Sequence, residues 1–339
     1  INLARFGKSV RVFEKRGDVG KRHANSRQAI FGGAEYTKSI LKRCNLADAK
    51  VQDDEFSRFR IATDKREGVF ELKPPGQLIE RGGKNSLEYS LCRIARKEGV
   101  QFEFNAEKQE GDADIVATGP YRADAVAYGQ VFENANLPKD QITLVYSDRY
   151  SPRAWYMYAM PHGKRMVEIV NCVSDPHLKK VKELYHRGLK EVACLKEIVE
   201  GATPIYDVAG IGNAEMPKTC VHGGRLYVGE AAGFQDAAYG FGMEFALLSG
   251  RLAAEAVAQG KDYDALWKRE FMDMLKLRFA KRFILASCGN WLIDRYISMK
   301  PDGSIIDNGK MHETLLRHRV LLNSLFYLEM AKKRATGYW

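Results

Sequence analysis

The sequence predicts an α/β fold that combines a βαβ-type parallel-sheet domain, an inserted antiparallel sheet and a helical C-terminal region. Three observations lead to this prediction. Residues 225–257 pass from a short apolar strand through an acid and several glycines into an Ala/Leu-rich helix. Residues 130–172 contain short β-branched and aromatic runs, which are typical of antiparallel strands. Residues 263–297 and 313–333 carry apolar side chains at helical spacing.

Composition places the chain among ordinary globular proteins. It has 339 residues, and 45% of them are hydrophobic, which is enough for a stable core. No window reaches the roughly 18 apolar residues of a membrane span and no secretory leader begins the chain, so we expect an intracellular, cytoplasmic protein. The six cysteines show no CxxC pair, and we expect reduced thiols. The seven histidines are dispersed; we expect surface or turn residues and no metal site.

The net charge of +10 admits nucleic acid, an acidic membrane surface or a phosphate-bearing small molecule as partner. No nucleic-acid module accompanies the basic residues, so we expect no nucleic-acid partner. The apolar stripes of the C-terminal helices, flanked by Lys and Arg, fit either a cover over the protein's own core or peripheral contact with a membrane.

The first residues resemble the second half of a βαβ unit. Residues 1–7 are expected to end a helix at a glycine, and residues 9–13 form a strand that ends at Glu14 and Lys15. An acid at this position can hold a ribose hydroxyl pair, although an ordinary surface acid fits equally. The glycine-rich turn that should precede the helix is not in the chain, so we expect the chain to begin in mid-element.

The middle of the chain alternates between the two predicted domains. We expect a helix at 37–44, strands at 56–79 around a Pro74–Gly76 turn, a helix at 86–98 and a strand at 100–104. A further strand at 114–118 ends in Thr118 and Gly119, which fits a ligand-facing strand end or a plain turn. Antiparallel strands are expected at 142–146, 155–160 and 166–173, and one helix at 176–200. In the predicted strand, Trp155 lies on one face and Tyr156 and Tyr158 lie on the other. An aromatic face of this kind fits either the lining of a cavity or packing against the core.

The glycine-rich stretch is the candidate ligand site. A strand at 226–228 is followed by Glu230, Gly233 and the Gly240–Gly242 turn, and a helix starts at Met243. Glycines allow close backbone approach, a helix N-terminus offers unpaired amides, and an acid can bind a hydroxyl. No HExxH, Walker or Gly-x-Ser-x-Gly motif occurs, so we expect an organic cofactor to carry any catalysis.

Residues 229–233 (Gly-Glu-Ala-Ala-Gly), 240–243 (Gly-Phe-Gly-Met) and 249–254 (Ser-Gly-Arg-Leu-Ala-Ala) resemble the second flavin motif of the geranylgeranyl reductase family. These are FAD-dependent oxidoreductases of the p-hydroxybenzoate hydroxylase architecture, and the likeness extends to about residue 297. The resemblance implies a Rossmann-like FAD-binding domain, here N-terminally truncated, that carries an inserted antiparallel substrate domain and C-terminal helices. The implied ranges are 1–52, 83–129 and 213–262 for FAD; 53–82 and 130–212 for substrate; and 263–339 for the helices.

The resemblance also implies roles for particular residues. The implied FAD contacts are Glu14, Lys15, Arg81, Thr118, Gly119, Gly229, Glu230, Ala232, Gly233, Gly240, Phe241, Gly242 and Met243. The segment 155–161 resembles the family's aromatic motif, which implies that Trp155, Tyr156, Tyr158 and Pro161 line the cavity for an isoprenoid chain. The catalytic proton donor stays unassigned.

The chain departs from the family pattern in several places. The first Gly-x-Gly-x-x-Gly motif is absent, Glu230 replaces an Asp, Met160 replaces a Phe, and the strand at 114–118 is not followed by Asp-Gly. The last departure argues against a monooxygenase. We therefore expect hydride transfer from reduced FAD to double bonds of a hydrophobic small molecule, with NAD(P)H or a ferredoxin-like protein as electron donor. The alternatives are an FAD monooxygenase or halogenase acting on an aromatic compound, and a non-catalytic fragment.

Overall fold

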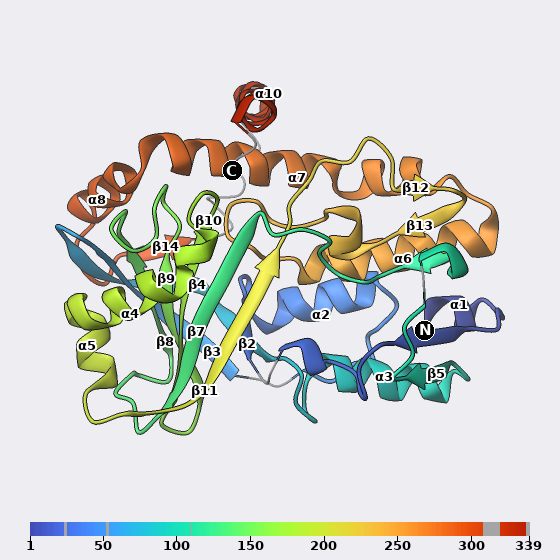
Figure 1. Ribbon diagram of the computed structural model, residues 1–339, viewed down its shortest axis with the longest axis horizontal. Coiled ribbons are helices and arrows are strands. Elements are labelled where there is room, and N and C mark those ends of the chain that lie inside the picture. Colours follow the sequence, from blue (N-terminus) through green and yellow to red (C-terminus); the bar gives the residue numbers. More distant parts are fainter. Residues whose placement is uncertain (24–25, 52–53, 109, 308–318, 337–339) are drawn as a thin grey trace.

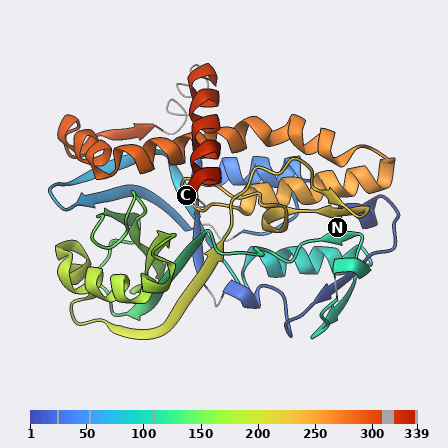
Figure 2. The same ribbon diagram turned by 45° about the horizontal axis from the view of Figure 1, so that its top comes forward.

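The computed structural model describes residues 1–23, 26–51, 54–108, 110–307 and 319–336. Two halves lie side by side, and helix α7 (Tyr263–Cys288) runs along both of them (Figures 1 and 2). One half is built on a large sheet, and the other contains the glycine-rich stretch. This arrangement confirms the mixed α/β class predicted from the sequence.

In the described part of the chain, nine strands form the large sheet, in the order β11, β7, β10, β9, β8, β3, β4 and β14, with β2 pairing to β4 as well. Their bounds are β2 Arg27–Ile30, β3 Asp54–Thr63, β4 Glu67–Glu80, β7 Ala125–Glu133, β8 Gln141–Tyr146, β9 Met157–Gly163, β10 Met166–Ser174, β11 Thr203–Gly212 and β14 Ile305–Asp307. Most neighbours are antiparallel, whereas β3–β8 and β4–β14 are parallel. The strands predicted near 142–146, 155–160 and 166–173 are confirmed.

The predicted turn at Pro74–Gly76 is wrong, because these residues lie inside β4 and the chain turns at 64–66 instead. Strand β14 pairs with residues 71–73 of β4, and β2 pairs with residues 77–80, so the prolines stand between two partner strands. On the other side of β4, the register against β3 shifts at the same level. Proline cannot donate a ladder hydrogen bond, and a bulge is a place where a strand tolerates it.

In the other half, the described residues form two small sheets instead of one continuous sheet. Strand β1 (Arg11–Glu14) pairs in parallel with β5 (Gln101–Phe104). Strand β6 (Ile115–Val116) pairs in parallel with β13 (Arg225–Tyr227), which also pairs with β12 (Val221–His222). Helices α1 (Asn2–Arg5), α2 (Gly33–Arg43), α3 (Leu87–Lys97) and α6 (Met243–Gln259) belong to this half. The predicted helix tail, the strand ending at Glu14 and the helix from Met243 are confirmed.

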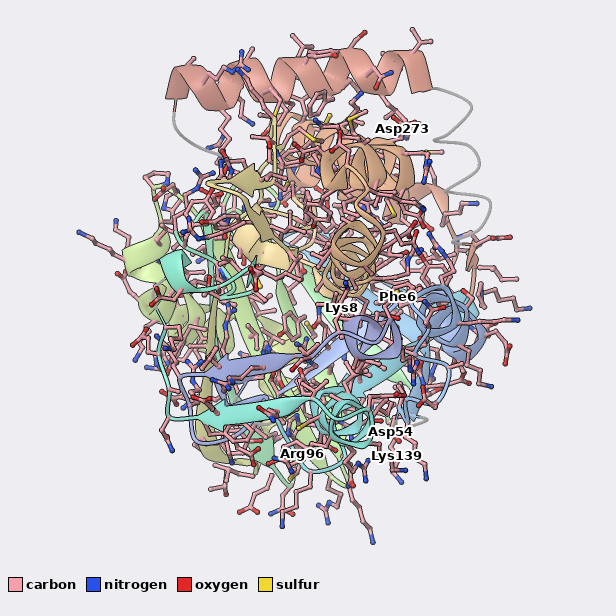
Figure 3. The ribbon with its side chains drawn as sticks, turned by 90° about the vertical axis from the view of Figure 1, so that its right-hand side faces the viewer. Phe6, Lys8, Asp54, Arg96, Lys139 and Asp273 are labelled. Carbon is pink, nitrogen blue, oxygen red and sulfur yellow. The ribbon has the colours of Figure 1, made fainter. Side chains whose placement is uncertain are left out.

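Two predicted long helices are each broken. The helix predicted at 176–200 is α4 (Val181–Glu191) and α5 (Ala193–Val199), which are separated by an extended Val192. The helix predicted at 263–297 is α7 and α8 (Asn290–Met299), and Gly289 at φ +55° separates them. Helix α10 (Arg319–Thr336) forms part of the predicted 313–333 helix, whose first residues lie outside the described ones. Seen from the side, α10 lies across the outer surface of α7 (Figure 3).

The core has a separate cluster in each half. Helices α2, α6 and α7 bury Ile40, Leu248 and Trp267 together in the glycine-rich half. Helices α4 and α5 cover one face of the large sheet, where Tyr185 and Leu195 pack with its strands.

The domain ranges given above stay a prediction. Strand β2 pairs with the large sheet although it lies within the range 1–52 that was implied for FAD, and β7 extends across the implied boundary at residue 129. None of the described helices has the length and apolar character needed to cross a bilayer.

Candidate functional site

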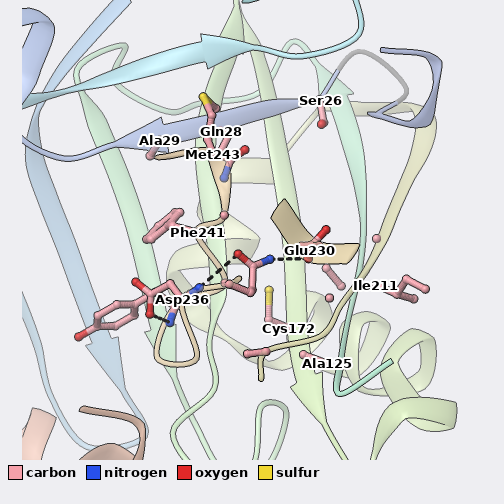
Figure 4. A pocket seen from close by; sticks show the side chains of 18 of the residues that line it. Ser26, Gln28, Ala29, Ala125, Cys172, Ile211, Glu230, Asp236, Phe241 and Met243 are labelled. Atoms are coloured by element: carbon pink, nitrogen blue, oxygen red, sulfur yellow. Dashed lines mark hydrogen bonds between the residues drawn. The ribbon is translucent and has the colours of Figure 1, made fainter. Parts of the chain in front are cut away.

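A cavity of about 560 Å³ lies where the glycine-rich stretch meets the large sheet (Figure 4). Its walls come from strands β2, β3 and β7–β11 and from residues 228–246. Most of the exposed lining is apolar, with a few charged side chains at one end. A concave site of this size and chemistry is typical of small-molecule and cofactor binding.

Glycines form one wall of the cavity. Strand β13 ends at Tyr227, and a 3₁₀ turn, η4 (Gly229–Ala232), follows with Gly229 at φ +56°. Gly240 has φ +78°, a left-handed conformation that favours glycine, and the position of its absent Cβ is open space. Helix α6 begins after Gly242 and has no side-chain N-cap bond. Its first amides are therefore unpaired by any cap and available to a ligand.

Glu230 is held at this wall by two partners. Its Oε1 accepts a 2.7 Å hydrogen bond from Gln235, which is drawn dashed at Glu230 in Figure 4. Its Oε2 lies 3.6 Å from the guanidinium of Arg22. Arg22 also donates to the carbonyl of Ile211 at 3.2 Å. Burial raises the pKa of Glu230, although Arg22 opposes the shift. The cavity is therefore lined by the guanidinium of Arg22, which can bind a phosphate, and by the carboxylate of Glu230, which can bind a hydroxyl.

Arg81 is the centre of a second charged cluster. It donates to Gln28 and Glu88, and its Nη2 lies 2.9 Å from Nε2 of His23. Burial lowers the pKa of His23 to about 4, with Arg81 acting in the same direction. Burial alone would raise the pKa of Glu88, but Arg81 outweighs it and the net pKa is lowered. Near neutral pH the cluster therefore holds the neutral imidazole of His23 beside the paired Glu88 carboxylate and Arg81 guanidinium.

Aromatic rings form another part of the lining, the aromatic wall. Tyr156, just before β9, and Tyr158, on β9, have ring centroids 6.2 Å apart, and the Tyr156 hydroxyl donates to the carbonyl of Tyr239 at 2.6 Å. Phe241, in the glycine turn, packs edge-on against Phe31 with centroids 5.2 Å apart. The glycine turn and the large sheet are thus joined by direct ring contacts.

A buried chain of polar groups leads from this aromatic wall to a second cavity of about 490 Å³. The Tyr158 hydroxyl, at the first cavity, donates to Glu168 at 3.2 Å. The other oxygen of Glu168 lies 3.3 Å from Nδ1 of His162, at an ion-pair distance. Nε2 of His162 lies 2.8 Å from the hydroxyl of Tyr206, and both residues line the second cavity. Glu168 is 1% exposed, and Oε2 also accepts the Arg27 amide at 2.9 Å.

The structure brings most of the predicted site residues to the first cavity. Those that line it are Arg81, Gly119, Trp155, Tyr156, Tyr158, Gly229, Glu230, Gly240, Phe241, Gly242 and Met243. Thr118 and Pro161 each adjoin a lining residue in sequence but do not line the cavity themselves. Ala232 and Gly233 do not line it either; they lie between the lining residues Glu230 and Gln235.

Glu14 and Lys15 lie away from the first cavity, at the end of β1. Glu14 accepts the amide of Arg16 at 2.9 Å, and Lys15 pairs with Glu107 at 3.4 Å. Their predicted contact with an adenosine ribose stays a prediction.

Sequence reasoning missed Arg22, Gln235 and the Glu168–His162 pair. The expectation that His162 is a surface or turn residue is wrong, because it is buried at 8% exposure beside Glu168. The β9–β10 hairpin sets the two residues against each other, and the signal available in the sequence was an acid inside a mostly apolar strand. Nothing in the sequence near Arg22 indicates that it reaches Glu230.

No family model matches the chain, and no curated protein matches it. Several solved structures are similar to it. A geranylgeranyl bacteriochlorophyll reductase-like protein from Thermoplasma acidophilum is similar with a TM-score of 0.69 and 18% identity, over 93% of this chain and 90% of that one. A triple mutant of the flavin-dependent brominase Bmp2 is similar with a TM-score of 0.61 and 14% identity, over 99% of this chain and 95% of that one. A flavoprotein/dehydrogenase from Cytophaga hutchinsonii is similar with a TM-score of 0.60 and 12% identity, over 98% of this chain and 90% of that one. At these identities the likeness establishes a shared fold, and the Rossmann-like α/β class predicted from the sequence is confirmed.

Proposed function

We propose that this chain is an FAD-dependent oxidoreductase that reduces carbon–carbon double bonds of a hydrophobic, isoprenoid-like substrate. The observation that carries the proposal is that one cavity is lined both by the glycine wall and by the aromatic wall. The glycine wall suits a flat, phosphorylated cofactor, and the aromatic wall suits an apolar chain. Similar structures include a reductase-like protein and several flavin-dependent enzymes, which agrees with this division.

The residues at the glycine wall fit FAD. Gly240 leaves open space where a side chain would stand, and the amides at the start of α6 can meet the edge of a flavin ring. Arg22 and Arg81 line the same cavity and offer positive charge to a pyrophosphate. Glu230 would accept a hydrogen bond from a ribityl hydroxyl. When bound, reduced FAD supplies the hydride, and NAD(P)H or a ferredoxin-like protein would supply its electrons.

Tyr158 is the proposed proton donor. Hydride addition to one alkene carbon requires a proton at the other carbon, and Tyr158 is the end of the buried polar chain that lies at the cavity. Burial, followed by the charge of Glu168, raises the pKa of Tyr158 well above its ordinary value, so the phenol stays protonated before the reaction.

The proton lost from Tyr158 is replaced along the chain. Glu168 and His162 lie between Tyr158 and the second cavity, so solvent in that cavity, near Tyr206, would supply the replacement proton along these two residues. The substrate gains one hydride and one proton, and the protein returns to its starting state.

The test is reduction of a polyprenyl substrate under anaerobic conditions by protein loaded with FAD and reduced with dithionite. We expect the mass gain that saturation of a double bond produces. Loaded, reducible protein that leaves the polyprenyl compound unchanged would contradict the proposal.

A second candidate is an FAD monooxygenase or halogenase that acts on an aromatic compound, because halogenases occur among the similar structures. Oxygen consumption with formation of a hydroxylated or halogenated product would favour it. A folded chain that takes up no FAD would favour the third alternative, a non-catalytic protein.

A further inference from the structure

The second cavity differs from the first in the charge of its lining. It has a volume of about 490 Å³ and lies between strands of the large sheet and the loop 82–84 before α3. Among its described lining residues, Lys21, Arg27 and Lys84 are cationic, and Glu80 is the one acid. Neither Lys21 nor the loop 82–84 lines the first cavity. The second cavity is therefore a separate place in which a ligand with negative charge can bind.

One cation is built into the wall of this cavity, and two stand at its surface. Arg27 lines both cavities, its side chain is 7% exposed, and its Nη1 lies 2.6 Å from the carboxylate of Asp54. Lys21 and Lys84 are exposed, and neither forms an ion pair with another described residue. The charge of Arg27 is thus already matched by a carboxylate, whereas the charges of the two lysines are available to a ligand.

A glycine contact brings these two lysines to the same cavity. Gly20 has φ +71°, and a Cβ at this position would stand 2.8 Å from Cα of Gly82. Only glycine combines this conformation with such a close approach. The 3₁₀ turn η1 (Lys21–His23), which follows Gly20, therefore comes next to the loop that carries Lys84.

The loop before α3 also offers backbone amides. Gly82, at φ +75°, donates its amide to the carboxylate of Glu88 at 3.4 Å. The next two amides, those of Gly83 and Lys84, donate to no other described residue. Turn amides beside cationic side chains are typical of phosphate-binding sites, because both groups bind anionic oxygens.

We propose that the second cavity binds the phosphate group of a small molecule. Lys21 and Lys84 would pair with the phosphate oxygens, and the amides of Gly83 and Lys84 would donate to them. Glu80 would accept a hydrogen bond from a hydroxyl of the same molecule, since its carboxylate repels the phosphate itself. This inference does not depend on the proposed reaction.

The test is a calorimetric titration of the full chain with inorganic pyrophosphate at constant ionic strength, with and without saturating FAD. We expect saturable binding that FAD leaves unchanged, and binding at least about tenfold weaker in Lys21→Gln/Lys84→Gln. The matched control is Lys139→Gln/Lys196→Gln, which removes the same charge at two exposed lysines that do not line the cavity. We expect this control to bind like the unmodified chain.

Glu80→Gln should change the affinity in the opposite direction. Removal of the one described acid of the lining should tighten pyrophosphate binding by about threefold, because a like charge is lost. Circular dichroism and thermal unfolding of the Lys21→Gln/Lys84→Gln variant should match those of the unmodified chain, since both lysines are exposed.

Three outcomes would overturn the inference. They are absence of pyrophosphate binding, an equal loss of affinity in the two double-lysine variants, and competition between pyrophosphate and FAD, which would place the probe in the first cavity. A chain that binds pyrophosphate but takes up no FAD would contradict the proposed function and support this inference.

Displacement of bound pyrophosphate distinguishes the sources of the phosphate. Displacement by adenosine 2′,5′-bisphosphate identifies a nucleotide, and displacement by geranyl phosphate identifies the phosphorylated end of an apolar molecule. Displacement by neither compound identifies free phosphate as the ligand.

Discussion

The two walls of the cavity are built in different ways. The aromatic wall belongs to a large sheet in which nine described strands pair with one another and buried side chains such as Met157 and Ile169 are fully enclosed. The glycine wall belongs to a half whose described strands form two small sheets. There the side chains at the cavity are held by ion pairs between distant segments, such as Arg22 with Glu230.

The difference shows where rigidity and adaptability lie in the site. Packing fixes the aromatic wall, because a close-packed interior yields only at high free-energy cost. The glycine wall is fixed by backbone conformation and by charges that a bound anion can engage. We therefore expect steric substitutions to affect the stability of the sheet half most, and pH or charge substitutions to affect the glycine-rich half.

The largest effect is expected from Gly129→Val in β7. A Cβ at this position would overlap the carbonyl oxygen of Ile169 and stand 2.6 Å from Cα of Val170, and neither backbone atom can move away. We expect the free energy of unfolding in urea to fall by about 4 kcal/mol. Gly210→Val on the neighbouring strand β11 is the control, since no atom lies within 4 Å of its Cβ position. Equal losses in the two variants would contradict the claim that packing fixes this wall.

Tyr158→Phe should lower the rate of double-bond reduction by about 10²-fold, because general acids contribute at least that much. Uptake of FAD and its reduction by dithionite should stay unchanged. Tyr156→Phe is the control, because Tyr156 lines the same cavity and bonds to Tyr239, outside the polar chain. A Tyr158→Phe variant that turns over like the unmodified enzyme would exclude Tyr158 as proton donor.

His23 should make the glycine-rich half sensitive to acid. Its folded pKa is about 4 against an ordinary 6.5, so the unfolded chain binds the proton first. The stability that this difference provides is complete above pH 6.5 and is lost as pH falls toward 4. When the pH is lowered from 7 to 4.5, we expect the free energy of unfolding in urea to fall by about 2 kcal/mol less in His23→Gln than in the unmodified chain. Parallel pH dependence of the two proteins would refute this.

Glu230→Gln should give the smallest effect on stability. Unlike the loss expected from Gly129→Val, this effect is a stabilisation at pH 7. The folded pKa of Glu230 is raised by burial, so its ionisation destabilises the folded state once pH exceeds the unfolded pKa. We expect the variant to be more stable at pH 7, by less than about 1 kcal/mol, and this gain to disappear by pH 4. Glu35→Gln, exposed on α2, is the control. A destabilised Glu230→Gln variant at pH 7 would mean that the Arg22 contact outweighs burial.

Local pattern was sufficient to predict the sheet half, because alternation and β-branched runs identify strands such as β8 and β10 directly. It was sufficient also for the Gly229–Met243 segment, where glycines, an acid and a helix start follow one another along the chain. It failed for Pro74–Gly76, since a bulge between two partner strands is a tertiary feature. It failed for the ion pair between Arg22 and Glu230, because the two residues are far apart in sequence and no local pattern predicts that they meet.

The most direct test of the shared cavity is a fluorescence titration of FAD into the unmodified chain, Gly242→Val and Gly250→Val. Gly242 lines the cavity at φ −112°, a conformation that valine can adopt, whereas Gly250 lies further along α6 with no atom within 4 Å of its Cβ position. We expect saturable binding by the unmodified chain and Gly250→Val, and binding at least about tenfold weaker in a folded Gly242→Val. Equal FAD affinity in all three proteins, or no binding by the folded unmodified chain, would contradict the account.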